Sequence, residues 1–483
     1  MKRQHPIAIL RYVSKNFWLL LIPLLRGLLA LRFDFYNWLS GAYLDILVVL
    51  AIFGAAFFHW WNVNFCIGKK RIYVRTGLFI RESMKIPYTS ITAVSIKKSF
   101  AMRPLRAVTI LLDTDSSSTV NKREDPDVKL IIREKDVDKM LTYFKMESDE
   151  KKICYKSNRR RMLFFSLAFS SALSGLIYFG TFLIQGGRLV GNELEERFLG
   201  AVNNVTRVAE KVIYGITPVT VGIIIILGAG WLYSFISNYL RHINFELEKS
   251  KNGIQIKSGF FSRWLYYINA DKVNYADLRQ NMLMKIFRVM SVNVSCSGYG
   301  KQKNEIPVFV PVTGKKNVAE VMEKFLPEFS SDEGARYDVK PSYIMKFLGP
   351  PSVLIFAIIL LFSAVIFFFP EWYSVALFAA AMGEIVAVHL LIVNLAAFLS
   401  NGVEICKGSI VVRYCKAFGF HNVIAPLDKI SEIRISQNFL QKLNGSCNFL
   451  LYTRGERATR HRIRGLQLCD AEKAVSQLGY STN

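Results

Sequence analysis

Long apolar runs divide the chain and predict six membrane-spanning helices in three pairs. The paired runs cover residues 16–35 with 42–61, 161–185 with 212–240, and 344–369 with 373–399. A run of about 20 apolar residues crosses a hydrocarbon core of about 30 Å, and in water it would leave Leu, Ile and Phe uncovered. The first run contains Pro23 and Arg26. We count it as a span because the charge pattern described below requires an even number.

A period-two pattern follows each pair and predicts short, half-buried strands. The segment IPYTSITAVSIKKSF begins at Ile86, and it aligns without gaps with INADKVNYADLRQNM from Ile268 and APLDKISEIRISQNF from Ala425. The apolar positions coincide in all three segments. Three ungapped copies with shared apolar positions indicate an internal repeat.

The copies extend in both directions in the same register. Upstream, Gly77 lies over Gly259, each between two strand-like runs where a hairpin turn needs a residue that tolerates positive φ. The third copy has Lys416 at that place and Gly419 three residues later, so we expect its turn to be built differently. Downstream, amphipathic patterns predict one short helix per copy, at residues 134–146, 315–327 and 468–479.

The charge distribution predicts how the chain lies across the membrane. The 483 residues are 52% hydrophobic, yet the formal net charge is +25. Lys and Arg concentrate in the N-terminal segment and in the segments that follow each pair, about 62–160, 241–343 and 400–483. The positive-inside rule therefore predicts a multi-pass cell-membrane protein with both termini and all three large segments in the cytoplasm. All seven cysteines fall in these segments, where thiols stay reduced, so no disulfide is expected.

The repeated unit resembles the bacterial pleckstrin-homology-like (PH-like) family of membrane proteins, whose YdbT-type members carry three such domains. The resemblance rests on the strand–glycine–strand RIYVRTGLFIR, the Ile86–Pro87 step and its relative Ala425–Pro426, the DK pairs of ADKV and LDKI, and ISQNFLQKLNG with Gly445. It implies that each unit is a small antiparallel β-barrel or sandwich capped by a C-terminal helix. The predicted fold is thus membrane α + β, with six transmembrane helices in three hairpins, each followed by one PH-like domain.

The predicted boundaries follow from this organisation. Hairpins are expected at 1–61, 161–240 and 344–399, and PH-like domains at 62–150, 241–330 and 400–483. The first copy lacks the DK pair and carries the acidic, Ser-rich insertion DTDSSSTVNKREDPD, which we expect to be a mobile loop. The first two copies lack a glycine at the Gly445 position, with Arg106 or Ala107 and Val289 or Met290 near it, so the turn there is expected to differ in shape.

No motif for catalysis, cofactor binding or metal binding is present in the sequence. The six histidines are scattered, without an H-E-x-x-H pattern, and there is no G-x-S-x-G elbow or phosphate-binding loop. Cys406 and Cys415 are too far apart for a zinc knuckle. We therefore predict a protein that is not an enzyme, has no cofactor and binds no metal.

Four polar side chains fall inside the predicted spans, where an ionisable group is costly and usually has a reason. They are Arg26, Glu384, His389 and Asn394. They could line a polar track for a solute, a proton or a lipid headgroup, or they could serve as contacts between helices. Residues five apart on a helix differ in direction by about 140°, so the last three do not share one stripe. This spacing favours contacts between helices.

Basic residues recur at corresponding stretches of the three copies and are candidates for contact with lipid or a partner. They are Lys97, Lys98, Arg103, Arg106, Arg279, Lys285, Arg288, Arg434 and Lys442. Anionic headgroups of the inner leaflet explain such clusters at about 1 kcal/mol per basic residue near the surface. The alternative is that they reflect only positive-inside topology and solubility. Nucleic acid is not an expected partner, because the clusters lack the stacking aromatics of a strand-binding face.

Two functions remain open at this point. The first is a membrane scaffold whose three cytoplasmic domains bind partner proteins, peptides or anionic headgroups; the family resemblance implies a role in envelope stress or antimicrobial tolerance. The second is a transporter or export component for a lipid or peptide, in which the domains gate or oligomerise the helices. Expected partners are inner-leaflet lipids and either a membrane protein encoded nearby or another copy of this chain.

Overall fold

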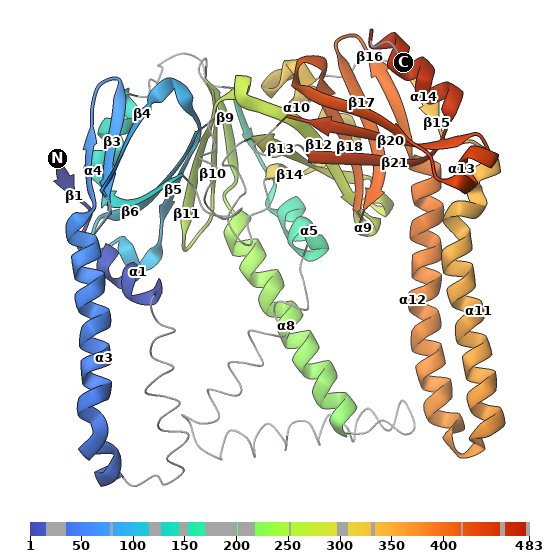
Figure 1. Ribbon diagram of the computed structural model, residues 1–483, viewed down its shortest axis with the longest axis horizontal. Coiled ribbons are helices and arrows are strands. Elements are labelled where there is room, and N and C mark those ends of the chain that lie inside the picture. Colours follow the sequence, from blue (N-terminus) through green and yellow to red (C-terminus); the bar gives the residue numbers. More distant parts are fainter. Residues whose placement is uncertain are drawn as a thin grey trace.

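The computed structural model describes residues 1–15, 35–77, 81–114, 127–143, 153–169, 200, 218–250, 253–296, 308–329, 334–416, 419–454 and 459–479. Figure 1 shows three β-rich domains side by side in a row, with the long helices projecting from one side of it. The N-terminus lies at one end of the row, and the C-terminus lies in the domain at the other end.

The first domain packs two antiparallel sheets face to face beneath a helix. Its elements are β1 (Lys2–Arg3), α1 (Ala8–Lys15), β2 (Asn64–Ile67), β3 (Arg71–Thr76), β4 (Glu82–Pro87), β5 (Ile91–Lys98), β6 (Ala107–Thr114), β7 (Val128–Arg133) and α4 (Glu134–Tyr143). Strands β1 to β4 form one sheet, and β5 to β7 belong to the other. Val74 and Ile96 from the two sheets meet Val137 of α4 in one core. Of the predicted insertion loop, residues 115–126 lie outside the described residues.

The second and third domains repeat this plan, which confirms the predicted sandwich with a C-terminal helix. The second contains β8 (Ile153–Lys156), β9 (Glu246–Ser250), β10 (Gly253–Ser258), β11 (Arg263–Ile268), β12 (Val273–Asn281), α9 (Met282–Ile286), β13 (Val289–Cys296), β14 (Val308–Gly314) and α10 (Lys315–Phe325). The third contains β15 (Ala335–Asp338), β16 (Gly402–Cys406), β17 (Ser409–Lys416), β18 (Gly419–Pro426), β19 (Ile430–Ser436), α13 (Phe439–Leu443), β20 (Ser446–Thr453), β21 (Thr459–Gln467) and α14 (Leu468–Gln477).

Neighbouring domains share their sheets. Strand β5 of the first domain pairs antiparallel with β11 of the second, which makes one seven-stranded sheet. Strand β12 of the second pairs in the same way with β18 of the third, which makes another. Side chains also cross these joints, because Tyr267 of β11 packs into the first core and Ala93 of β5 packs into the second. The three domains are therefore held together by backbone hydrogen bonds as well as by the covalent chain.

Five helices project from or lead toward the row on one side (Figure 1): α3 (Phe35–Asn62), α5 (Arg159–Phe169), α8 (Pro218–His242), α11 (Ile344–Phe368) and α12 (Tyr373–Ser400). Among the described residues, Pro341–Phe368 and Ala379–Ser400 are long and apolar enough to cross a membrane, with mean hydropathy 2.7 and 2.0. A shorter apolar stretch is Ile46–Asn62. The count of six spans stays a prediction, and residues 16–34 of the first run, including Arg26, lie outside the described residues.

Each predicted hairpin is bracketed by a pair of adjacent strands. The strand before it pairs antiparallel with the strand after it, as β1 with β2, β8 with β9, and β15 with β16. The chain therefore leaves and re-enters each domain at neighbouring strands. An excursion that returns to its starting side can cross a membrane only an even number of times, which supports the pairing of the predicted spans.

The turns of the β-hairpins β3–β4 and β10–β11 contain the predicted glycines at positive φ. Gly77 and Gly259 have φ of 109° and 99°, conformations that glycine adopts without steric cost. In the second domain Ser258 pairs with Trp264 across a five-residue turn, whereas in the third Lys416 pairs with Gly419, which leaves two residues between them. The expectation of a differently built third turn is confirmed.

The prediction for the Gly445 position is wrong, because the three turns adopt the same conformation there. Arg106, Arg288 and Gly445 occupy equivalent positions of the repeat and have φ of 50°, 53° and 60°. The left-handed conformation costs a residue with a Cβ roughly 1–2 kcal/mol. Two arginines therefore hold a turn that glycine makes without strain.

Truncation of Tyr267 tests whether a joint contributes to the core of its neighbour. Tyr267 is 6% exposed and belongs to the first core, although it comes from the second domain. Tyr267→Ala should lower the free energy of unfolding by about 3 kcal/mol, because it removes a buried ring and leaves a cavity. Thermal unfolding in mild detergent measures this change as a lower midpoint. Tyr143→Ala, at a 37% exposed ring, is the matched control, and equal effects of the two variants would contradict the joint's role.

Candidate functional site

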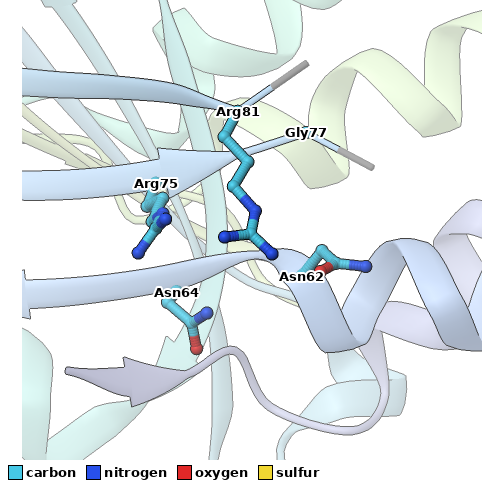
Figure 2. A pocket seen from close by; sticks show the side chains of 5 residues that line it. All are labelled: Asn62, Asn64, Arg75, Gly77 and Arg81. Carbon is cyan, nitrogen blue, oxygen red and sulfur yellow. The ribbon is translucent and has the colours of Figure 1, made fainter. Parts of the chain in front are cut away.

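A small polar pocket lies where α3 enters the first domain (Figure 2). Its lining residues are Asn62, Asn64, Arg75, Gly77 and Arg81, and its volume is about 150 Å³. Asn62 ends α3, and Asn64 begins β2 opposite Arg75 of β3. The positive φ of Gly77 turns the chain beyond β3, and Arg81 extends back toward Asn62. The pocket thus gathers side chains from a long helix and from a β-hairpin.

The pocket has the donor set of an anion site. Two guanidinium groups and two amides line it, and no carboxylate is among its lining residues. Guanidinium groups pair with phosphate through parallel hydrogen bonds. The sequence predictions missed Arg75 and Arg81. Their signal was the placement of two arginines on either side of Gly77 in RTGLFIR, because a hairpin brings the residues on its two sides together.

The basic residues predicted in the strands are engaged with the protein itself. Lys97 lies over the Trp264 ring, 4.4 Å from its centroid, and so spans the first joint. Lys98 forms an ion pair with Glu134 of α4. Arg279 lies 3.8 Å from Asp277, and Arg434 lies 2.7 Å from Glu432. The Lys97 contact bridges the first joint and the Lys98 contact ties β5 to α4, whereas the other two pairs each lie within one strand.

The remaining predicted basic residues lie in three equivalent tip segments, which we define as residues 99–106, 281–288 and 438–445. They are Arg103, Arg106, Lys285, Arg288 and Lys442. Large apolar side chains in the same segments are 47–77% exposed: Phe100, Leu105, Leu283, Ile286, Phe287, Phe439 and Leu443. Lys285 lies over the Phe420 ring at 4.1 Å, and burial lowers the pKa of its ammonium group. Each tip segment therefore mixes exposed apolar side chains with cations.

Each tip segment lies close to the place where a helix leaves its domain. In the first, Met102 packs on the same small cluster as Trp60 of α3. In the second, the ring of Phe287 lies 4.7 Å from that of Phe164 in α5. In the third, Tyr343, just before α11, donates a hydrogen bond to the Asn444 carbonyl at 2.7 Å. The tips therefore lie at the level where the helices leave the domains.

A further contact ties the first tip segment to α8. Arg103 donates to the backbone carbonyls of Phe260 and Phe261 in the β10–β11 turn, at 3.0 and 2.8 Å. The Phe260 N–H in turn donates to the carbonyl of Leu240 near the end of α8. The first tip is thus positioned from both α3 and α8.

The predicted intramembrane polar residues are not gathered into one stripe. All three described members lie on α12, where Glu384 and Asn394 are half-buried and His389 is exposed. The Glu384 Oε1 atom is buried without a hydrogen-bond partner among the described residues. Arg26 lies outside the described residues.

A buried polar network occupies the second joint. The Asp277 Oδ2 and His421 Nδ1 atoms lie 2.8 Å apart across β12 and β18. The Tyr414 ring stacks on His421, and Tyr414 Oη lies 3.0 Å from His461 Nδ1. Burial raises the pKa of Tyr414, so its hydroxyl stays protonated, and the tautomer of His461 sets the direction of their hydrogen bond. All four side chains are less than 10% exposed. The Asp277–His421 contact fastens the second domain to the third, and the other contacts position His421 from within the third domain.

Comparison with known proteins places this fold in a family. The family model described as Bacterial PH domain matches residues 9–146, 198–326 and 353–482. Each match ends just after the C-terminal helix of one domain, at α4, α10 or α14. The matches together cover most of the chain, so the chain belongs to the bacterial PH domain family, as the repeat predicted.

A particular relative is the UPF0699 transmembrane protein YdbT of Bacillus subtilis (strain 168). It is 25% identical over 146 residues, which are 30% of this chain and 29% of the relative. The aligned part thus spans less than a third of that protein. No solved structure matches. Neither the family description nor the name of the relative refers to an enzyme, and among the described residues no cluster of His, Cys, Asp and Glu could hold a metal ion.

Acidification should weaken the second joint through His461. Burial lowers the pKa of His461 from 6.5 to about 4, so the unfolded chain takes up the proton first as the pH falls. The stability contributed by the neutral ring is complete above pH 6.5 and is lost progressively toward pH 4. Unfolding midpoints across this range should fall more steeply for the unchanged protein than for His461→Gln, since the carboxylates titrate equally in both. Parallel curves would show that His461 does not titrate in this way.

Proposed function

We propose that this protein is a non-enzymatic membrane scaffold that holds a row of three PH-like domains against the inner leaflet and binds anionic lipid headgroups there. The single observation that carries the proposal is the threefold recurrence of a tip segment with exposed apolar side chains and cations, close to the place where a helix leaves the domain. Membership of the bacterial PH domain family and the transmembrane relative support the membrane setting.

The chemistry of the tips suits the boundary between headgroups and acyl chains. Phe439 and Leu443 are 77% and 70% exposed, and such side chains gain free energy when they leave water for that boundary. Lys442 lies between them in sequence and can reach the phosphate layer. Each basic residue near an anionic surface contributes about 1 kcal/mol. The apolar side chains set the depth of contact, and the cations favour anionic lipid.

The strained arginines of the first two tips also support headgroup binding. Arg106 and Arg288 occupy left-handed positions where glycine would be less strained, as Gly445 is in the third tip. Strain of this kind persists at functional positions, because the charged group is useful there. We therefore assign Arg106 and Arg288 to headgroup contact, and the pocket of Arg75 and Arg81 to a separate headgroup phosphate.

The shared sheets support the proposed scaffold role. A rigid row can present several partner sites at fixed spacing along the membrane, and a role in envelope stress or antimicrobial tolerance is consistent with such a device. The alternative role as a transporter rests on one observation, the unpartnered Oε1 of Glu384. A scaffold should tolerate Glu384→Gln without loss of function, whereas a transporter that uses this carboxylate should not.

Replacement of the strained arginines by glycine should separate stability from lipid binding. Arg106→Gly with Arg288→Gly should raise the unfolding midpoint, because each change relieves about 1 kcal/mol of backbone strain. The same double variant should be stabilised less by added phosphatidylglycerol, because two cations are lost. Thermal unfolding in detergent, with phosphatidylglycerol or phosphatidylcholine added, measures both effects.

The matched control for that experiment is Gly445→Arg in the third tip. It adds a cation at the equivalent position and should lower the midpoint while increasing the response to phosphatidylglycerol. An unchanged lipid response in both variants would exclude these positions from headgroup contact.

The pocket can be tested with a soluble headgroup mimic. Glycerol phosphate should raise the unfolding midpoint of the unchanged protein, and Arg75→Gln with Arg81→Gln should abolish that rise, since the pocket then has no cation. Lys69→Gln with Lys70→Gln removes the same charge from the turn between β2 and β3, outside the pocket lining, and should preserve the response. An equal loss in both double variants would indicate general charge screening and no defined site.

A further inference from the structure

The row of domains ends in two free strand edges that are complementary to each other. In the described part of the chain, β4 pairs only with β3 and β19 pairs only with β20. By position in the repeat, β4 corresponds to β11 and β18, and β19 corresponds to β5 and β12. The two internal joints are β5 with β11 and β12 with β18. The free edges are therefore the two halves of the same kind of joint.

The two internal joints use one register. Ile96 pairs with Leu265 in the first, and Leu278 pairs with Asn422 in the second. In the ungapped alignment Leu278 lies over Ile96, and Asn422 occupies the position of Leu265. The joints are therefore identical in register, although the apolar Leu265 of one joint is replaced by the polar Asn422 in the other. Backbone geometry, shared by all three domains, sets the pairing.

Exposure follows pairing at these positions. In β11, Trp264, Tyr266, Tyr267 and Ile268 are all buried, and their equivalents in β18, which are His421, Val423, Ile424 and Ala425, are buried too. In β4, by contrast, only Ile86 is buried, and Met84 is 38% exposed. Strand β19 likewise has one buried residue, Ile430, where β5 has six. The free edges therefore expose backbone and side-chain positions that the internal joints cover.

We infer that a second copy of this chain pairs its β4 with β19 of the first, in the register of the internal joints. That register places residues 81–86 opposite 432–437, with Ser83 facing Ile435 and Lys85 facing Ile433. At the first joint the equivalent of Pro87, Asn269, donates its N–H to the Thr92 carbonyl, a hydrogen bond that Pro87 cannot make. The second joint forms without that bond, because its equivalent residue is Pro426, so Pro87 does not prevent pairing. The contact is heterologous, so copies extend the row or close it into a ring.

This copy-to-copy joint is compatible with insertion of both copies in one membrane. Both internal joints leave the helices on one side of the row (Figure 1), so a third joint built the same way keeps the helices of both copies on that side. The copy-to-copy joint is weaker than the internal ones, because β4 offers Ser83 and Lys85 where β11 offers Leu265 and Tyr267. Charged residues at such an edge also limit pairing with unrelated strands. The inference deepens the proposed scaffold role and is independent of lipid binding.

Cysteine cross-linking in native membranes tests the register. Ser83→Cys and Ile435→Cys are introduced together into a chain in which the exposed Cys66, Cys154 and Cys469 are serine. Opposed residues of antiparallel strands have Cα atoms about 4.5–5.5 Å apart, within disulfide range. Mild oxidation should then give a ladder of dimers and larger multiples on a non-reducing gel. Mixed copies that each carry one of the two changes should stop at dimers.

Two controls make the result decisive. Ile96→Cys with Leu265→Cys occupies the equivalent positions at the first internal joint and should cross-link within one chain. Ser83→Cys with Ile433→Cys is shifted by two residues, at a diagonal distance of about 7–8 Å, and should cross-link far less. The proposal is overturned if the internal pair forms while no ladder appears, if the shifted pair forms equally well, or if the new band has the mass of a different protein. The phosphatidylglycerol response, measured on the same membranes after extraction, reports separately on lipid binding.

Discussion

The hydrogen-bond ladders that join β5 to β11 and β12 to β18 fix the spacing of the domains and of the helices attached to them. Each ladder converts two exposed sheet edges into the middle of a larger sheet, which removes unpaired backbone groups from solvent. Side chains follow the backbone across the joint, so Tyr267 completes the first core and Ala93 the second. A change at one joint is therefore felt in the core of a neighbouring domain.

The strands that bracket each predicted hairpin extend this constraint toward the membrane. Because β15 pairs with β16, the start of α11 and the end of α12 are held side by side, and the two helices run antiparallel between them (Figure 1). The same arrangement of strands holds the chain on either side of the other two excursions. The tip segments lie close to the same helix ends. Apolar tips, basic side chains and helix ends are thus brought to one level by the fold.

The tips show how stability and charge are balanced in this protein. At one repeat position the third domain uses Gly445, whereas the first two use Arg106 and Arg288 in the same left-handed conformation. The cost of that conformation is roughly 1–2 kcal/mol for a residue with a Cβ, a large share of the usual stability of a domain. In the strands, by contrast, Lys97 lies over the Trp264 ring at the first joint, and Lys98 pairs with Glu134 at the surface.

The sequence alone determined the repeat, the short strands, the closing helices and the glycine turns at Gly77 and Gly259, because each depends on local periodicity or on φ at one residue. It did not reveal that the sheets are shared, because alternation shows which face of a strand is buried and leaves the partner of its edge unspecified. Lys97 therefore resembled a surface cation until Trp264, far away in sequence, was seen beneath it. The sequence likewise did not reveal that Arg75 and Arg81 line one pocket with Asn62, which is distant from them in sequence. Only the tertiary structure decided these contacts, because they depend on which strand edges meet.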